Sequence, residues 1–408
     1  MAMLTHSYYE EDPRVRREAE ALVARGRPVD VFALRRPGDP RDGELNGVRI
    51  HRVDVQRHQG AGLGTYLREY LSFLVRSGWA VTRSHRCRRY AVLHVHTLPD
   101  FLVFAGLPLK LRRVPILLDL HEAMPEFYRT RFPRASNPLA HRLLLAQERA
   151  SIAFASAVLT VNDALRDRLV GLGVPADKVT VILNSPSLAL FDPGAQPRRA
   201  FAEDGQVRIV YAGALSPTYE LDIALAGLAR LAAQRPDLRV RFDVYGRDFG
   251  EGELAADAAR LGVSDRVTFH GRIPLEAVPA ALAGADIGLA PTRRNSFTDF
   301  SLSTKIFEYG AMDKPVIASR LPMVEQMFPA GTVATYTPGD PDDLAAAILR
   351  IVDRPAERDA AVRATAERVR ELAWDHEAER LAGLVDRLAA ERHAIPRSGP
   401  EPTDALSR

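Results

Sequence analysis

Short apolar runs alternate with amphipathic helical patterns along nearly the whole chain, and this alternation limits the possible folds more than any other feature. Residues 1–6 read as a strand, residues 12–26 as a helix with its apolar side chains on one face, and residues 29–34 as the next strand. This order is typical of parallel sheets with crossover helices. Similar strands recur further along: VRIHRVDV, AVLHVHTL, PILLDLHE, AVLTV, VRIVYAG, RVRFDVYG, RVTFHG, DIGLAP, PVIAS and TVATY. The sequence therefore predicts an α/β protein with doubly wound sheets.

The chain is long enough for two hydrophobic cores. Its 408 residues exceed what one core usually serves. Proline, glycine and charge replace the periodic pattern over residues 184–205, which indicates an interdomain linker. We therefore predict a first Rossmann-like domain over residues 1–190 and a second over residues 205–370. Residues 371–394 read as a C-terminal helix, and residues 395–408 as a disordered tail.

Composition excludes several classes of protein. The 55 basic and 52 acidic residues give a net charge of only +3, so we expect no nucleic-acid partner. The single cysteine, Cys87, permits neither an internal disulfide nor a cysteine-based metal site. The sequence shows neither a signal-peptide pattern nor an apolar run of about eighteen residues, so we expect a cytoplasmic protein.

Residues 65–90 mix aromatic and leucine side chains with several arginines. A helix over residues 65–81 followed by RSHRCRRY is a candidate for peripheral contact with the inner face of a membrane. The alternative is a solvated helix whose apolar stripe belongs to the core.

Residues 301–319, SLSTKIFEYGAMDKPVIAS, place two charges on a helix that faces the protein interior. Lys305 falls in the first helical turn, where a cation opposes the helix dipole, and Glu308 shares its face. The polar residues before Lys305 offer a helix N-terminus that can bind an anion. A lysine near phosphate, with a carboxylate beside it for ribose hydroxyls, suits a nucleoside diphosphate. The alternative is an exposed salt bridge of little energetic weight.

The segment KIFEYGAMDKPVIAS resembles the nucleotide-site signature of the retaining GT-B glycosyltransferases of family four. Other segments occur in the order that this family shows: THSYYEEDPRVRREAEALVARG, VLHVHTLPD, LLDLHEAMPE, VYAGALSPTYELDIALAGL, DRVTFHGRIP and ADIGLAP. The resemblance covers about residues 10–394. It implies two Rossmann-like domains facing each other across a cleft, with the C-terminal helix crossing back to the first domain.

The resemblance also implies a reaction: transfer of a sugar from a nucleotide-diphosphate sugar to a hydroxyl or amino acceptor, with retention and without a metal or other cofactor. The donor would bind the second domain and the acceptor the first. The catalytic residues it implies are His121 and Lys305. The donor-binding residues it implies are Glu308, Lys305, Arg247, Ser303, Thr304, Gly213 and Asp299.

Several positions depart from the family pattern. Phe300 stands where many relatives carry an acid, and the adjacent Asp299 is a candidate substitute. Thr218 and Glu220 stand where relatives place a diphosphate-binding cation and a glycine, and we expect Arg247 to supply the missing charge. Ser303 replaces a proline, and a serine there can cap the helix.

The first strand-to-helix turn, SYYEEDP, lacks the glycines of many relatives and instead forms an acidic, aromatic rim. An acceptor could hydrogen-bond to this rim, although Asp12 itself reads better as a helix N-cap followed by Pro13. His94 and His96 project to one face of their strand, and with no third ligand apparent we expect acceptor contact or a structural role rather than a metal. The expected acceptor-side residues are His96, Tyr8, Tyr9 and Glu122.

Two other functions stay open from the sequence. One is a non-catalytic GT-B partner of another glycosyltransferase, suggested by the missing cation at Thr218. The other is a GT-B sugar-nucleotide epimerase. The acceptor is not identified, and both a lipid-linked molecule and a small metabolite fit.

Overall fold

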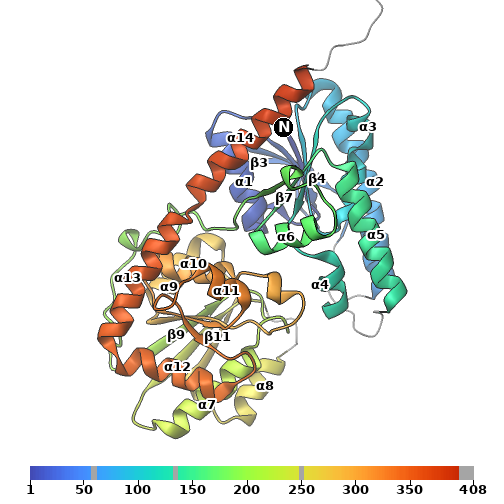
Figure 1. Cartoon of the computed structure of the whole chain (residues 1–408). Coiled ribbons are helices and arrows are strands. Elements are labelled where there is room, and N and C mark those ends of the chain that lie inside the picture. Colours follow the sequence, from blue (N-terminus) through green and yellow to red (C-terminus); the bar gives the residue numbers. More distant parts are fainter. Residues whose placement is uncertain (57–61, 132–136, 248–251, 395–408) are drawn as a thin grey trace, which may run out of the picture.

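The computed structural model describes residues 1–56, 62–131, 137–247 and 252–394. It consists of two α/β domains, one above the other in Figure 1, and a long helix that runs from the second back along the first. The predicted α/β architecture with two sheets is confirmed. The tail at residues 395–408, which we expected to be disordered, lies outside the described residues.

The first domain is built on an eight-stranded sheet in the order β3-β4-β2-β1-β5-β6-β7-β8. All neighbouring strands are parallel except β3 and β4, which form an antiparallel pair. The strand order reverses between β1 and β5, and ligands of such folds bind at the carboxyl ends of the strands near the reversal. The strands are β1 (Ala2–Leu4), β2 (Asp30–Leu34), β3 (Asp42–Leu45), β4 (Val48–Val53), β5 (Leu93–His96), β6 (Ile116–Leu120), β7 (Ala157–Thr160) and β8 (Val179–Val181).

Helices cover both faces of this sheet (Figure 1). They are α1 (Pro13–Ala24), α2 (Leu63–Arg88), the 3-10 helix η2 (Asp100–Gly106), α3 (Leu107–Lys110), α4 (Met124–Arg131), α5 (Pro138–Phe154) and α6 (Asp163–Gly171). The sequence patterns did not anticipate β3, β8, α4 and α6, because each is short and carries a weak periodic signal.

The second domain repeats the plan with a six-stranded parallel sheet in the order β11-β10-β9-β12-β13-β14. Its strands are β9 (Val207–Ala212), β10 (Val240–Tyr245), β11 (Val267–Gly271), β12 (Ile287–Ala290), β13 (Val316–Ser319) and β14 (Ala334–Tyr336). Its helices are α7 (Leu221–Gln234), α8 (Glu253–Arg260), α9 (Val278–Ala283), α10 (Thr304–Ala311), α11 (Pro322–Met327), α12 (Pro341–Asp353) and α13 (Pro355–Glu371). All six strands match the apolar runs of the sequence.

Helix α1 begins as its sequence predicts. The Asp12 carboxylate accepts a hydrogen bond of 3.1 Å from the Val15 amide, and Pro13 occupies the first turn. This is the N-cap arrangement that satisfies a free helix N–H group.

Helix α2 is longer than the predicted 65–81 and continues through RSHRCR to Arg88. No proline or glycine interrupts residues 82–88, and the basic side chains of the last turn favour the helix dipole. The arginine cluster is therefore the end of an exposed helix and not a loop.

The last two helices connect the domains. Helix α13 packs on α10, where a side chain at Gly310 would clash with Thr365 and Val369. Helix α14 (Trp374–Ala394) then packs on the first domain: Trp374 and Leu381 are buried in the same cluster as the β1 and α1 side chains. The predicted crossing-back of the C-terminal helix is confirmed.

We expect Leu381→Ala to lower the free energy of unfolding by about 2–5 kcal/mol, because Leu381 is fully buried between α14 and the first domain. Chemical denaturation measures the change. Arg387→Ala, at an exposed position of the same helix, is the control and should change stability little. Equal effects of the two substitutions would contradict the packing of α14 described above.

Candidate active site

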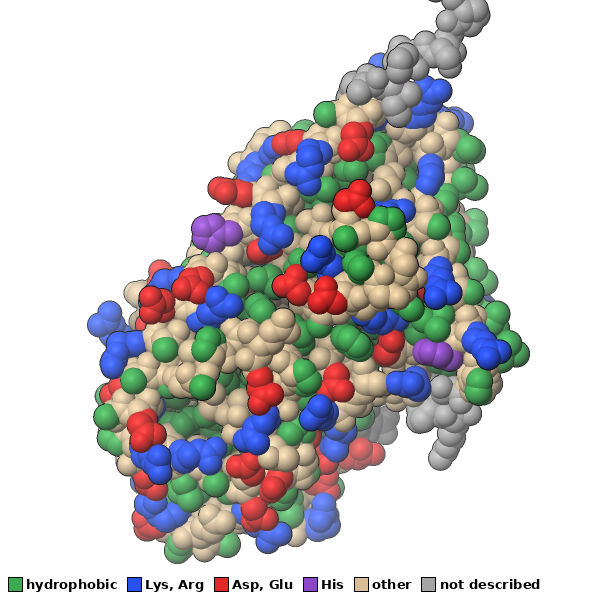
Figure 2. Space-filling view, viewed as in Figure 1, with side chains coloured by type: hydrophobic (Ala, Val, Ile, Leu, Met, Phe, Trp, Pro, Cys, Tyr) green, Lys and Arg blue, Asp and Glu red, His purple; other side chains and the backbone are tan. Residues whose placement is uncertain are grey.

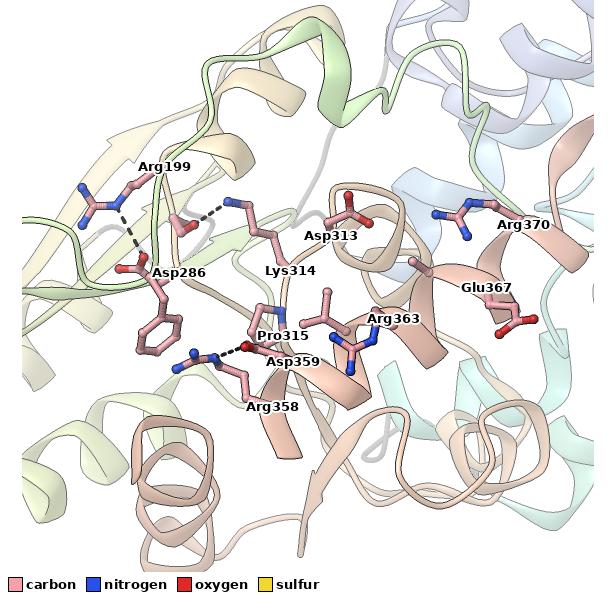
Figure 3. Close-up of a pocket in the computed structure, with 14 residues that line it drawn as sticks. Arg199, Asp286, Asp313, Lys314, Pro315, Arg358, Asp359, Arg363, Glu367 and Arg370 are labelled. Atoms are coloured by element: carbon pink, nitrogen blue, oxygen red, sulfur yellow. Dashed lines mark hydrogen bonds and ion pairs between the residues drawn. The ribbon is translucent and has the colours of Figure 1, made fainter. Parts of the chain in front are cut away.

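One hollow of the second domain lies at the amino ends of β12 and β13 (Figure 3). It measures about 740 Å³ and is lined mainly by charged residues, several of them already paired. Arg199 lies 3.4 Å from Asp286, and Lys314 donates hydrogen bonds to two backbone carbonyls. Because ligands of such folds bind at the carboxyl ends of the strands, this hollow is at the wrong edge of the sheet.

The second pocket, about 410 Å³, lies between the carboxyl ends of both sheets. The first domain contributes His121, Glu122 and Phe127, and the second contributes residues of the loops after β9 and β12. Asn162 joins the two sides, because its side-chain amide donates a hydrogen bond of 2.8 Å to the Phe300 carbonyl. This interdomain pocket is the candidate active site.

Helix α10 begins at the wall of this pocket with Ser303 and Thr304. Ser303 occupies the N-cap position, but its side chain makes no capping hydrogen bond, so the predicted cap is wrong. Its buried Oγ has no hydrogen-bond partner among the residues that the structure describes. The amino end of α10 thus lies at the pocket without a side-chain cap, and such a helix end can bind an anion.

Lys305 is buried, and its ammonium group lies over aromatic rings. Its Nζ is 4.1 Å from the centroid of the Tyr219 ring and 5.0 Å from that of Tyr211. Tyr219 itself lines the pocket. A side chain at Gly213 would place its Cβ 2.7 Å from this Nζ and still closer to Cε, so glycine is required for Lys305 to hold this position.

Glu308 lies one turn further along α10 and is half-buried. Burial raises its pKa, against the opposing charges of Lys305 and Arg17. Arg17, from α1 of the first domain, contacts Asn184 and stacks 4.7 Å from the Trp374 ring. Burial lowers the Arg17 pKa to about 10, and the nearby charge of Arg14 acts in the same direction. The sequence did not single out Arg17, because consecutive arginines on a helix read as a solvated face.

His121 follows β6 directly and lines the pocket with its side chain 24% exposed. Its Nδ1 is 3.7 Å from an Asp119 carboxylate oxygen. Burial acts to lower the His121 pKa, but the nearby negative charge of Asp119 outweighs it, so the pKa is raised. The imidazole is therefore held more readily in its protonated, hydrogen-bond-donating form.

Asp119 is fully buried and belongs to a charged network behind His121. Arg14 donates hydrogen bonds of 2.8 and 3.0 Å to it and lies 3.1 Å from Glu18. Burial opposes ionisation of Asp119, but the charge of Arg14, the hydrogen bond with His96 and the nearby His121 imidazole hold its pKa well below the usual range. The network anchors α1 to β6 and so fixes the position of His121.

His96 belongs to the same network and not to the acceptor side as predicted. It is fully buried, and its Nδ1 is 3.1 Å from Asp119. The prediction of no third metal ligand is also corrected, because donor atoms of Glu18, His94, His96 and Asp119 lie within 4.8 Å of one another. The Arg14 guanidinium already pairs with both carboxylates, so a metal ion would have to displace it.

The side chains of the predicted acidic, aromatic rim form ion pairs or lie in the hydrophobic core. Tyr9 is fully buried with the α1 and α14 side chains, so the prediction that it contacts an acceptor is wrong. Tyr8 lies beneath Arg36, with 4.5 Å from the guanidinium to the ring centroid, outside the pocket lining. Glu11 pairs with Arg272 of the second domain at 2.6 Å and thereby links the domains.

Three other positions singled out from the sequence lie away from the pocket lining. Asp299 pairs with Arg294 at 3.0 Å, and Arg247 is exposed at the end of β10. Glu220 is buried, where its carboxylate accepts hydrogen bonds from Ser319, Tyr336 and the Gly339 amide. The family glycine has thus been replaced here by a structural carboxylate.

Comparison with known proteins covers both domains. Residues 12–185 match the family described as Glycosyl transferase 4-like domain, and residues 206–354 match Glycosyl transferases group 1. A D-inositol 3-phosphate glycosyltransferase of Thermomonospora curvata is 24% identical over 89% of this chain and 87% of its own length. The alpha-D-kanosaminyltransferase of Streptomyces kanamyceticus is 23% identical over 85% of this chain and 91% of its own length.

Solved structures show the same fold. Sucrose-phosphate synthase of Thermosynechococcus elongatus aligns with a TM-score of 0.76 at 21% identity, covering 96% of this chain and 99% of that one. Anabaena HepE in complex with UDP-glucose aligns with a TM-score of 0.71 at 18% identity, covering 95% and 99%. The two sheets, the cleft and the returning helix define a glycosyltransferase of the GT-B fold. The chain belongs to glycosyltransferase family 4.

We expect the His121 imidazole to titrate above the ordinary histidine pKa of 6.5, because Asp119 stabilises its cation. Histidine NMR of the wild type and His121→Gln assigns the signal and gives the value. The resulting stabilisation is fully present below 6.5 and is lost as the pH rises through the folded-state pKa. A His121 pKa below 6.5 would contradict this electrostatic account.

Proposed function

We propose that the protein is a retaining, metal-independent hexosyltransferase that moves a sugar from a nucleotide-diphosphate sugar to a hydroxyl or amino acceptor. The observation that carries the proposal is the start of α10, where a helix terminus without a side-chain cap lines the interdomain pocket, close to the buried Lys305 and the half-buried Glu308. Two comparisons support the proposal. HepE was solved in complex with UDP-glucose, and the matched relatives are named as glycosyltransferases.

The diphosphate would rest at the start of α10. Ser303, Thr304 and the first-turn amides would bind its oxygens, and Lys305 would supply a cation. Glu308 would accept hydrogen bonds from the ribose hydroxyls. As the glycosidic bond breaks, the leaving diphosphate gains negative charge, which these preorganised donors would stabilise without a divalent ion.

The second cation at this site would come from Arg17 rather than from Arg247. Neither arginine is among the residues that line the pocket, but Arg247 is exposed at the end of β10, whereas the charge of Arg17 acts to lower the pKa of Glu308. Arg17 comes from the first domain, so it would complete the donor site only when the two domains are together. This assignment offsets the loss of the usual cation at Thr218.

His121 would approach the transferred sugar from the opposite wall. Its raised pKa favours the protonated imidazole, which donates a hydrogen bond to a sugar hydroxyl. Glu122, beside it in the pocket, would face the acceptor.

We expect one nucleoside diphosphate from a panel of UDP, GDP and ADP to raise the unfolding temperature of the wild type, and both Lys305→Ala and Glu308→Ala to abolish the shift. Removing one hydrogen-bond donor from a site that stabilises a developing negative charge costs about 10²–10³-fold in rate. Glu325→Ala, an exposed glutamate of the same domain, is the control. Turnover of the matching nucleotide sugar, followed by NMR of the product, should show the donor's anomeric configuration.

A second candidate function is a non-catalytic partner of another glycosyltransferase, which the threonine at position 218 favours. Absence of stabilisation by every nucleotide in the panel would reject the transferase and favour this partner.

Gly213→Ala should weaken binding of the same nucleoside diphosphate about as much as Lys305→Ala, because the added methyl group occupies the space of the lysine side chain. Calorimetry measures the affinity. Gly284→Ala is the matched control, since its Cβ would meet nothing closer than 3.7 Å. Unchanged affinity in Gly213→Ala would show that the position of Lys305 is not needed for binding.

A further inference from the structure

Exposed apolar side chains concentrate on one side of the first domain. Ten large hydrophobic side chains are exposed in the part of the chain that the structure describes, and eight of them lie on α2, α3 and α5 or at their ends. These eight residues, which we call the lateral face, are Leu67, Leu71, Val75, Trp79, Leu107, Leu111, Leu139 and Leu143. Single apolar side chains scattered over a surface need no explanation, whereas eight gathered on one side of a domain do.

The lateral face is built from regular stripes. Its four residues on α2 recur at every fourth position, so they form one row about 18 Å long on the solvent side of the helix. Leu107 and Leu111 have the same spacing, as do Leu139 and Leu143. The 3-10 helix η2 packs against both α2 and α5, so these elements form one layer over the sheet (Figure 1).

The exposed charged side chains of this layer are all basic. Residues 63–88, 100–110 and 138–154 contain only three acids, and all three are buried: Glu69, Asp100 and Glu148. The arginines of the same segments are exposed: Arg68, Arg76, Arg83, Arg86, Arg88, Arg142 and Arg149. Figure 2 shows hydrophobic and basic side chains together along the edge of the molecule that carries α2, α3 and α5.

We propose that the lateral face docks on an anionic lipid bilayer. Exposed leucine, valine and tryptophan side chains enter the headgroup region, and the surrounding arginines bind lipid phosphates. Two copies of this face would bring like charges together, so self-association is disfavoured. No helix of the described chain is long and apolar enough to cross a membrane, which leaves contact at its surface as the way this face meets lipid.

One helix connects the lateral face with the candidate active site. Helix α4, which contributes Phe127 to the pocket, packs against α5. If the proposed transferase acts on a lipid-linked acceptor, docking would bring that acceptor to the mouth of the cleft. This consequence rests on the proposed function, whereas the docking itself is testable without donor or acceptor.

The two tryptophans give a direct test. Trp374 is 4% exposed in the core and Trp79 is 66% exposed on the lateral face, so a change of emission on adding vesicles reports on Trp79. With phosphatidylglycerol–phosphatidylcholine vesicles we expect a blue shift and co-sedimentation that weaken at high salt. Vesicles of phosphatidylcholine alone should give neither. Trp79→Phe should remove the shift while leaving most of the co-sedimentation.

Charge and apolar contact are tested separately. The triple variant Arg68→Glu, Arg83→Glu and Arg86→Glu should lower vesicle partitioning at least about tenfold. Its control, Arg230→Glu, Arg260→Glu and Arg354→Glu, changes the net charge equally but on exposed arginines of the second domain. Val75→Asp should also release the protein from vesicles, whereas Val170→Asp, exposed on α6, should not.

Thermal unfolding of every variant excludes loss of fold as the cause. Failure to bind anionic vesicles, or equal losses in the lateral-face variants and their controls, would overturn the proposal. So would a doubled solution mass that Val75→Asp returns to that of a monomer, because the face would then bind a second copy.

Discussion

The burial of α14 against the first domain is the interaction on which the rest of the structure depends. The chain leaves the second domain at α13, and the apolar side of α14 packs against α1 and the neighbouring strands. Polar contacts add to this packing: Asp386 pairs with Arg27, and Glu377 accepts a hydrogen bond from the Leu183 amide. Trp374, at the start of α14, also stacks with the Arg17 guanidinium, whose charge acts to lower the pKa of Glu308 in the second domain. The packing of α14 therefore helps to position a first-domain cation whose charge acts on a second-domain carboxylate.

Two kinds of electrostatic site meet in the cleft. On the second-domain side, an uncapped helix start and Lys305 offer positive potential to an anion. On the first-domain side, the buried Arg14–Asp119 pair holds His121 in place and raises its pKa. Removing one member of such a buried ion pair usually costs about 3–5 kcal/mol, because the other charge is left buried without a partner, so the fold as well as the site needs both members.

Much of the fold could be predicted from local sequence. Buried parallel strands are continuous apolar runs, and all six strands of the second sheet were visible in this way. Lys305 and Glu308 could also be recognised from the sequence, because charged residues are unexpected on a short helix whose other side chains are mostly apolar.

What could not be predicted depends on contacts between distant segments. Nothing near Arg17 in the sequence indicates that α14 will cover it, and Tyr9 reads as a rim residue until the core around it is known. His96 looked exposed to the cleft because its partners Asp119 and Arg14 are far away along the chain. Ser303 was expected to cap α10, but its buried hydroxyl makes no hydrogen bond to the helix, which local propensity does not register.

The most direct test of the account is a crystal structure of the protein with its nucleoside diphosphate. The account predicts that the diphosphate lies at the amino end of α10, between Ser303 and Lys305, with the ribose hydroxyls on Glu308. A diphosphate bound in the larger hollow at the amino ends of β12 and β13, or elsewhere outside the interdomain pocket, would contradict it.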